Sequence, residues 1–219
     1  MTDEGVDEGT PPKRTGIVLA GGRSTRFDDA DKAFAELAGE PMARRVATRL
    51  GSVTDELVVN CRNDQRARMA DIVADLASPV TIAVDEEPDR GPMAGIGTAL
   101  RAADGEYAAV VACDMPFVDP DFVELLFERA ASADAAVPRR ADGWYQTTQA
   151  VYRTEPMSTA CERALDRGER KILAPLESLE YEVVEEATVK REASTRTFEN
   201  VNTRSEFEAA AEWVHREEG

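Results

Sequence analysis

A segment near the N-terminus combines two glycines with basic side chains in a pattern that suits phosphate binding. It reads Leu19-Ala20-Gly21-Gly22 and continues to Arg26 and Lys32. Glycines let the backbone approach a ligand closely and turn successive N–H groups toward phosphate oxygens. Arginine then adds a forked donor and lysine a point charge. The segment predicts a site for a nucleoside triphosphate; the alternative is a glycine turn with solvated basic side chains.

The same segment differs from two widespread phosphate-binding patterns. The chain contains no GxxxxGK[ST] sequence, so a Walker A loop is excluded. It contains no GxGxxG sequence either, so dinucleotide binding has no support. We therefore expect backbone contact at 19–22, with charge supplied by Arg26 and Lys32.

A lone carboxylate stands at the end of a strongly apolar run. The run 107–113 reads YAAVVAC, and Asp114 follows it two residues before Pro116. Mg²⁺ takes one or two protein carboxylates and completes its shell with water and substrate phosphates. Beside a phosphate-binding segment, Asp114 is therefore a candidate magnesium ligand and, with Arg26 and Lys32, a candidate catalytic residue. The alternative is an aspartate that ends the strand before the proline.

Two amides stand just before the last helical pattern, in Asn200-Val201-Asn202-Thr203. Side chains two residues apart in an extended segment lie on one face, so Asn200 and Asn202 are expected to point the same way. The neutral oxygen of Asn202 is a candidate to complete the magnesium site. Alternatively, the segment is a turn in which Thr203 caps the following helix.

Further candidates follow two other apolar runs. Asn60 lies at the end of one run, where it can bind a base edge or a sugar or instead satisfy its own loop. Asp85 ends another, and Gly91 and Gly95 then bracket the start of a helical pattern. A helix N-terminus offers unpaired N–H groups and the positive end of a dipole to an anion. A plain helix-start turn at 91–95 is the alternative.

The elements that would position these residues alternate along the chain. Short apolar runs separated by helical patterns predict a mostly parallel sheet covered by helices on both faces. Ligands bind such sheets beyond the carboxyl ends of the strands, which is where the candidates lie. The expected strands are 15–20, 57–61, 80–84 and 107–113, with helices at 41–50, 64–76, 92–103 and 119–131. After residue 133 we expect strands at 135–139, 145–152, 181–186 and 197–201, with helices at 155–167 and 204–217.

These patterns predict an α/β fold, a Rossmann-like three-layer arrangement of a mostly parallel sheet with a small antiparallel addition. Residues 1–14 mix acids, glycine and proline without periodicity, which indicates a disordered acidic tail. Residues 15–219 contain no repeat or convincing linker, and their number suits a single domain.

The charge balance disfavours some kinds of partner. The chain has 43 acidic and 26 basic residues and a net charge of −17. Nucleic-acid binding depends on cationic contacts to phosphate, so we expect none. An acidic surface poor in lysine is typical of a halophilic source, where salt screens self-repulsion. With no apolar run long enough to cross a membrane and no targeting segment, the expected location is the cytoplasm, with no membrane partner.

Histidine and cysteine chemistry are both poorly supported. His215 is the only histidine, so a mechanism that needs a histidine base is close to excluded. The three cysteines, Cys61, Cys113 and Cys161, stand far apart without a CxxC pair. We expect them to be buried thiols.

The motifs together occur in the order and spacing of a known family. They read LAGGxSxR, Asp31-Lys32, VVN at 58–60, GPMAG at 91–95, CDMP at 113–116, GERK at 168–171 and NVNT at 200–203. From its first strand to its final helix the chain resembles the molybdenum cofactor guanylyltransferases. The resemblance implies a fold of the nucleotide-diphospho-sugar transferase type.

The resemblance also implies an activity: transfer of GMP from GTP to the terminal phosphate of molybdopterin or its molybdenum-loaded form, with release of pyrophosphate and a need for Mg²⁺. It implies that Asp85 binds the nucleoside portion, that Lys32 and Arg26 contact phosphates, and that Arg170 helps to line the cleft. Proteins that insert molybdenum or mature molybdoenzymes are the further partners implied. The candidate nucleotide-binding residues are Leu19, Ala20, Gly21, Gly22, Lys32, Asn60, Asp85, Gly91, Gly95 and Asp114, and the candidate metal ligands are Asp114 and Asn202.

This chemistry is compatible with the residues present. The second pKa of a phosphate monoester is about 6, so the acceptor is already largely anionic at neutral pH. No general base is needed, which suits a chain with a single histidine. The task that remains is to align two anions and to neutralise the charge that develops.

Some positions depart from the usual family pattern. Phe27-Asp28 stands where Met-Gly is usual, Gln146-Thr147 where His-Pro or Gln-Pro is common, and Arg204 where proline often follows NVNT. The alternatives are therefore a molybdopterin cytidylyltransferase, a guanylyltransferase for a deazaflavin or cobamide precursor, and a nucleotide-binding protein without turnover. Cytidylyltransferases typically carry LAAG, so Gly21, which leaves room in the base pocket, favours guanine.

Overall fold

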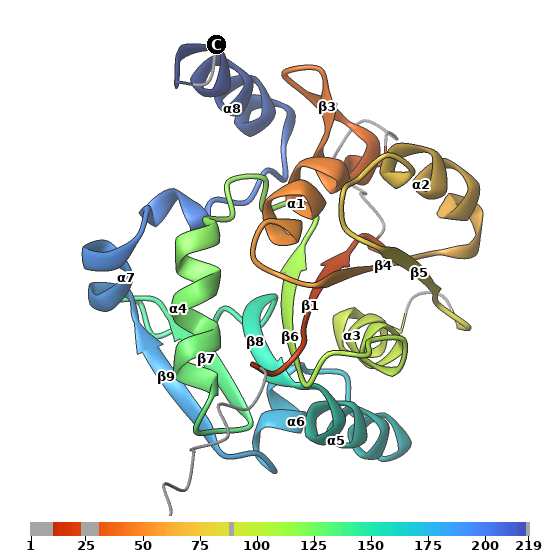
Figure 1. The fold of residues 1–219 in the computed structure, drawn as a ribbon, viewed down its shortest axis with the longest axis vertical. Coiled ribbons are helices and arrows are strands. Elements are labelled where there is room, and N and C mark those ends of the chain that lie inside the picture. Colours follow the sequence, from red (N-terminus) through yellow and green to blue (C-terminus); the bar gives the residue numbers. More distant parts are fainter. Residues whose placement is uncertain (1–10, 23–30, 88–89, 218–219) are drawn as a thin grey trace, which may run out of the picture.

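A seven-stranded sheet runs through the centre of the protein (Figure 1). The computed structural model describes residues 11–22, 31–87 and 90–217. In spatial order the strands are β5 (Val80–Val84), β4 (Glu56–Cys61), β1 (Arg14–Leu19), β6 (Tyr107–Ala112), β8 (Gln149–Arg153), β7 (Ala135–Arg139) and β9 (Tyr181–Glu185). Strands β5, β4, β1 and β6 are parallel, as are β7 and β9, whereas β8 is antiparallel to both its neighbours. The predicted mostly parallel sheet is therefore confirmed.

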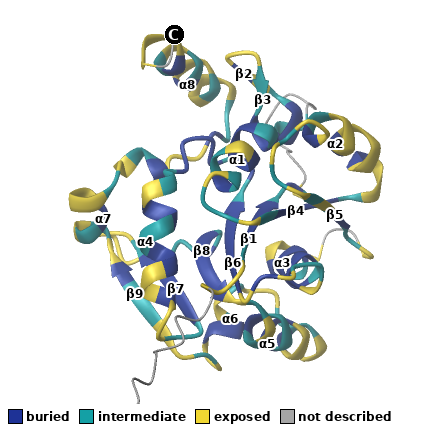
Figure 2. Ribbon diagram, viewed as in Figure 1, coloured by how far each residue is buried: buried dark blue, intermediate teal, exposed yellow. Residues whose placement is uncertain are grey.

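One face of the sheet is covered by α1 (Met42–Gly51), α2 (Arg66–Val73) and α4 (Pro120–Ala130). The other is covered by α3 (Pro92–Arg101), α5 (Thr154–Asp166) and α6 (Leu173–Leu176). Alternate strand residues serve the two faces, so Val18 packs in the first cluster and Ile17 in the second. Figure 2 shows the result, with buried strands between helices whose outer sides are exposed. These three layers agree with the predicted fold class.

A third apolar cluster lies at one end of the molecule. It joins a small antiparallel hairpin, β2 (Glu36–Leu37) and β3 (Glu40–Pro41), to α8 (Arg204–Glu217). The rings of Phe117 and Trp213 pack edge to face in this cluster, with 5.1 Å between their centroids. This cluster anchors the C-terminal helix beside the carboxyl ends of the strands (Figure 1).

The order of the strands creates a switch point beside β1. The chain passes from β1 to β4 and β5 on one side, and then crosses to β6 on the other. Loops after β1 and β6 therefore diverge and leave a crevice at their carboxyl ends, the usual ligand position in open α/β sheets.

The structure corrects several expected elements. Residues 197–201 are not a strand: Thr195–Phe198 is a 3₁₀ turn, η3, because the Ser194 side chain caps it and Phe198 is buried against Phe122. The strand expected at 145–152 begins only at Gln149. The helix expected at 64–76 is split into the 3₁₀ turn η2 (Asn63–Gln65) and α2.

Other small elements were not anticipated, namely the hairpin, α6, the turn η1 (Lys32–Phe34) and α7 (Glu186–Glu192). Strand β1 begins at Arg14, the last residue of the expected tail, and the Lys13 ammonium contacts Glu56 at 2.7 Å. Residues 1–10 of that expected tail lie outside the described residues.

The three cysteines are buried free thiols, as expected. Burial raises the pKa of Cys61 to about 11, so this thiol stays protonated and unreactive at neutral pH. Among the described helices, none is both long and apolar enough to cross a membrane.

Candidate nucleotide site

Strand pairing brings three candidate segments to one edge of the sheet. Leu19, the last residue of β1, is in register with Asn60 on one side and Ala112 on the other. The Ala20 N–H donates to the Asn60 carbonyl at 2.8 Å, and the Cys113 N–H donates to the Leu19 carbonyl at 3.0 Å. The glycine segment, Asn60 and the residues after β6 therefore meet at the switch point, as the sequence predicted.

A cleft of about 470 Å³ opens at this edge. Its walls come from the ends of β1, β4, β5 and β6 and from the start of α3. Most candidate residues contribute to them, and the lining includes Leu19, Gly21, Gly22, Lys32, Asn60, Asp85, Gly91, Gly95, Asp114 and Asn200. Ala20 does not line the cleft: it is buried, and its carbonyl accepts a hydrogen bond from Gln65 at 3.0 Å.

One wall of the cleft is a buried amide paired with a carboxylate. The Asn60 side chain donates to Asp85 Oδ1 at 2.7 Å and to the Ala83 carbonyl at 3.3 Å. A methyl group at Gly21 would lie 2.5 Å from Asp85 Oδ2, and one at Gly95 would lie 2.7 Å from Asn60 Oδ1. A side chain at either glycine would therefore displace a member of this pair.

Asp85 is electrostatically unlike an ordinary surface carboxylate. Burial raises its pKa, and the hydrogen bond from Asn60 and the charge of Arg62 offset only part of that effect. A carboxylate has about four acceptor sites, so the hydrogen bond from the Asn60 amide leaves Asp85 able to accept others. A hydrogen-bond donor on a ligand could bind to these remaining acceptor sites of Asp85.

Opposite this pair, three side chains converge from distant parts of the chain. The Lys32 ammonium donates to Asp114 Oδ2 at 3.0 Å and to Asn202 Oδ1 at 2.8 Å. The side chains of Lys32 and Asp114 are only 17% and 19% exposed, so their attraction is weakly screened by solvent. Asp114 and Asn202, both predicted as metal ligands, are thus brought together around the Lys32 ammonium.

Backbone contacts hold Asn202 at this place. The Val201 N–H donates to the Asp114 carbonyl at 2.8 Å. The Glu206 carboxylate accepts from the N–H groups of Asn202 and Thr203 at 2.7 and 2.9 Å, while the Thr203 hydroxyl accepts from the Glu206 N–H at 3.3 Å. This reciprocal capping box starts α8 and confirms the expected capping role of Thr203.

The oxygen donors around Lys32 suit a hard divalent cation. Mg²⁺ prefers carboxylate and amide oxygens and keeps several waters. No group of three or more histidine, cysteine or acidic side chains capable of holding a metal occurs in the part of the chain that the structure describes. Asp114 and Asn202 could hold a magnesium ion, with water and substrate phosphates as its remaining ligands, once the Lys32 ammonium turns from their oxygens toward the phosphates.

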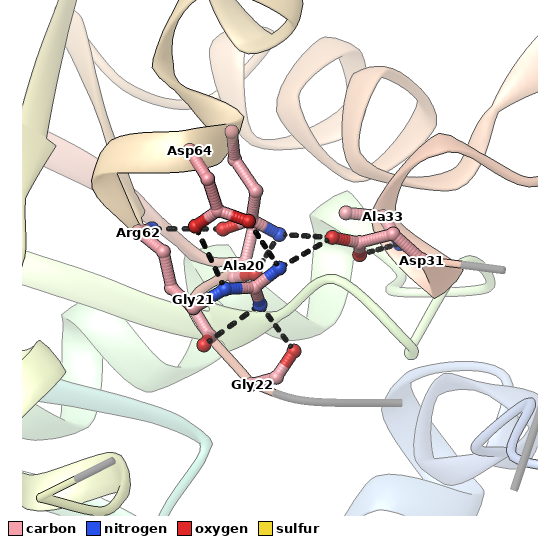
Figure 3. Close-up of polar contacts among 8 residues, drawn as sticks. Ala20, Gly21, Gly22, Asp31, Ala33, Arg62 and Asp64 are labelled. Atoms are coloured by element: carbon pink, nitrogen blue, oxygen red, sulfur yellow. Dashed lines mark hydrogen bonds and ion pairs between the residues drawn. The ribbon is translucent and has the colours of Figure 1, made fainter. Parts of the chain in front are cut away.

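Two side chains that contact the candidate site were missed by the sequence analysis. Arg62 and Gln65 follow β4 and contact both ends of the glycine segment, at Ala20–Gly22 and at Asp31 (Figure 3). Their place after β4, at the same edge as Asn60, is the signal that could have identified them.

Two other expectations have different outcomes. Arg26 lies outside the described residues, as does the acidic position Asp28. Arg170 is exposed and is not among the residues that line the cleft; its backbone carbonyl lies 4.0 Å from a methyl group placed on Gly91. Gly91 itself is the N-cap residue of α3, so the predicted helix start at the cleft is confirmed.

Comparison with known proteins identifies the class as nucleotidyltransferases, which generally use a divalent metal. A family model described as a MobA-like NTP transferase domain matches residues 16–182. The chain is 52% identical over 200 residues to the probable molybdenum cofactor guanylyltransferase of Natronomonas pharaonis, a match that covers 91% of this chain and 98% of that relative. It is 38% identical to the protein of the same name from Haloferax mediterranei, covering 90% and 92%.

A solved structure supports the same relationship. The molybdopterin-guanine dinucleotide biosynthesis protein A of Archaeoglobus fulgidus superposes with a TM-score of 0.75 at 27% identity, covering 92% of this chain and 99% of that one. The chain therefore belongs to the MobA-like NTP transferase family and is an enzyme of the nucleotidyltransferase type.

Proposed function

We propose that the protein transfers GMP from GTP to the terminal phosphate of molybdopterin or its molybdenum-loaded form and releases pyrophosphate. The observation that carries this proposal is that one cleft is lined both by the Asn60–Asp85 pair and by Lys32 and Asp114, with Asn202 bound to Lys32 behind them. The names of the relatives, which are molybdenum cofactor guanylyltransferases, support the same substrates.

The nucleoside is assigned to the wall formed by Asn60 and Asp85. The spare acceptor capacity of the Asp85 carboxylate suits a donor on the sugar or on the base. Gly21 and Gly95 keep the space beside this wall free of side chains. The triphosphate then extends along the backbone of Gly21 and Gly22 toward Lys32.

In the proposed reaction an anionic oxygen of the acceptor phosphate attacks the α-phosphorus of GTP. A new phosphoanhydride bond forms, and the bond to the β-phosphate oxygen breaks, so that pyrophosphate leaves with the electron pair. Lys32 orients the phosphates and neutralises charge that develops on them. Mg²⁺ held by Asp114 and Asn202 would supply Lewis-acid stabilisation of the phosphoryl oxygens. Arg26 is proposed to contribute a further phosphate contact.

The acceptor is proposed to approach from a second hollow of about 900 Å³ that shares Asn200 with the cleft. Asn202 lines this hollow, together with four basic and three acidic side chains: Arg140, Lys190, Arg196, Arg216, Glu186, Glu199 and Glu206. Glu186 pairs with Lys190 and Glu199 with Arg196. Local basic side chains are needed in this wall because a net charge of −17 repels an anionic substrate. The Arg196 guanidinium lies 4.2 Å from the ring centroid of Trp213, which orders this wall.

The test is incubation of the enzyme with GTP, Mg²⁺ and molybdopterin at high salt, with pyrophosphate release as the readout. Pyrophosphate release that depends on all three components is expected. Thermal shifts with MgGTP, MgCTP and MgATP check the base, and a clear preference for CTP would contradict the guanine assignment. Pyrophosphate release with another phosphorylated acceptor, but none with molybdopterin, would contradict the acceptor assignment.

A further inference from the structure

A single arginine behind the cleft connects the two ends of the glycine segment. Arg62 Nη1 donates to the carbonyls of Gly21 and Gly22 at 3.2 and 2.9 Å, and Nη2 donates to Asp31 Oδ2 at 2.9 Å (Figure 3). Gly22 and Asp31 flank residues 23–30 in the sequence. The Arg62 guanidinium therefore restricts the distance between Gly22 and Asp31.

Gln65 makes the same connection from the next turn. Its Nε2 donates to the Ala20 carbonyl at 3.0 Å and to Asp31 Oδ2 at 2.6 Å. Its Oε1 accepts from the backbone N–H of Arg62 at 2.8 Å. Gln65 is 3% exposed. Its amide is held rigidly, so the two donors act on Asp31 as a unit.

Neither side chain belongs to the cleft itself. Arg62 and Gln65 are absent from the residues that line it, whereas Gly21, Gly22 and Asp31 are present. The Arg62 side chain is 13% exposed, and its Nε donates to Asp64 Oδ1 at 3.1 Å. These residues touch the ligand-binding segment and not the space for a ligand.

We propose that Arg62 and Gln65 are positioning residues that shape the triphosphate-binding geometry of the glycine segment; this inference rests on the proposed function. They bind the successive carbonyls of Ala20, Gly21 and Gly22, so the negative ends of these peptide groups are held by protein donors. Since the Ala20 N–H donates to the Asn60 carbonyl, the N–H groups of Gly21 and Gly22 are the part of this backbone that we assign to phosphate oxygens.

The same contacts determine the placement and charge around Lys32. Asp31 Oδ1 accepts from the Ala33 N–H at 3.2 Å and so starts the turn η1, which carries Lys32. Asp31 Oδ2 is held by Arg62 and Gln65. Arg62 therefore neutralises a carboxylate that would otherwise repel the phosphates, and it fixes the start of the turn that presents Lys32.

The experiment compares triphosphate with monophosphate binding, because in the proposed binding mode only the triphosphate reaches both Gly22 and Lys32. The variants are Arg62→Ala, Arg62→Lys and Gln65→Glu, which sets a second carboxylate against Asp31. The control is Arg66→Ala, an exposed arginine at the start of α2. Calorimetry with MgGTP and with GMP is done on the full chain at one high salt concentration, and the thermal unfolding midpoint reports folding.

Arg62→Ala and Gln65→Glu are expected to weaken MgGTP binding roughly 10- to 100-fold, the size of a lost charged hydrogen bond, and to change GMP binding far less. Arg62→Lys should fall between the wild type and Arg62→Ala, because lysine restores the charge but not the fork. Arg66→Ala should bind both ligands as the wild type does. In turnover, KM for GTP should rise more than kcat falls.

Equal weakening of MgGTP and GMP, or unchanged MgGTP binding in folded Arg62→Ala and Gln65→Glu proteins, would overturn the positioning role. A wild type that prefers MgATP or MgCTP would overturn the guanine assignment alone, and the same comparison would then be made with that base. A wild type that binds no triphosphate would overturn both proposals.

Discussion

Two acidic side chains, Glu56 and Asp85, lie at opposite ends of the β4–β5 pair and are buried in different ways. Glu56 is the first residue of β4, at the amino ends of the parallel strands and away from the cleft. Its carboxylate accepts from the Thr15 hydroxyl and the Lys13 ammonium, both at 2.7 Å, and from the Asp104 N–H at 2.8 Å. Burial alone would raise the pKa of Glu56, but these hydrogen bonds outweigh it and hold that pKa below its ordinary value.

Asp85 follows β5 at the cleft, where the balance is reversed. Burial raises its pKa and prevails over the hydrogen bond from Asn60 and the charge of Arg62, which lower it. A carboxylate saturated by protein donors stabilises the fold, whereas one left short of donors is ready for a ligand. The comparison therefore assigns stability to the amino ends of these strands and binding to their carboxyl ends.

The largest expected effect is at the carboxyl end of β6. Asp114→Asn removes the charge that the proposed magnesium ion requires, so GMP transfer should fall by at least about 10²- to 10³-fold. The free energy of unfolding should fall by only about 1 kcal/mol, because the weakly screened charge attraction is lost but the amide still accepts a hydrogen bond from Lys32. Pyrophosphate release and urea unfolding measure the two quantities. Normal activity in Asp114→Asn would remove Asp114 from the metal site.

At the opposite end, Glu56→Gln should show the reverse pattern. Its amide N–H group would face the Lys13 ammonium, and the charged hydrogen bonds would be lost. We expect a loss of about 1.5–3 kcal/mol in the free energy of unfolding, with kcat and KM for GTP close to those of the wild type. Asp104→Asn, at a side chain that is 81% exposed, is the control and should alter stability little. A stable Glu56→Gln protein with impaired turnover would break the comparison.

How far the sequence predicts this arrangement depends on the origin of each contact. The central strands were predictable because their apolar runs are buried on both faces, and their ends located Asn60, Asp85 and Asp114 correctly. The contact of Lys32 with Asn202, 170 positions later, was not predicted; the sequence analysis offered Asn202 only as a candidate metal ligand beside Asp114. Apolar periodicity carries no information about such pairs.

Local contacts that depend on tertiary packing were not predictable in this way. Residues 197–201 have strand-like composition, yet the Thr197 hydroxyl accepts from the Asp119 N–H at 3.1 Å and stabilises a turn. Arg62 and Gln65 look like the polar start of a surface helix, and only the fold shows that they reach Asp31. Side-chain direction after a strand is decided by neighbours that are distant in sequence.

A smaller effect is expected when Asp85 is neutralised. Asp85→Asn keeps an oxygen that can accept from Asn60, but it removes the charge that would bind a ligand donor. MgGTP affinity should fall roughly 10-fold, the lower end for a hydrogen bond to a charged group. The protein without nucleotide should be slightly more stable at neutral pH, because a carboxylate whose ionisation is opposed by burial is gone. Calorimetry and urea unfolding on one preparation test both parts, and reduced stability with unchanged affinity would make Asp85 a structural residue like Glu56.

The smallest expected effect is in the pH dependence of stability, where the two carboxylates act with opposite sign. The pKa of Glu56 is lowered in the folded protein, so its contribution is complete above 4.5 and is lost as the pH falls below that value. The pKa of Asp85 is raised, so the folded state holds its proton longer, and stability declines as the pH rises above 3.8. Glu56→Gln should therefore reduce the loss of stability that occurs as the pH falls below 4.5. Asp85→Asn should remove the loss of stability that occurs as the pH rises above 3.8. Urea midpoints measured from neutral pH to below 3.8 distinguish these outcomes, and parallel curves for both variants would show that the two ends of the strands do not differ in this way.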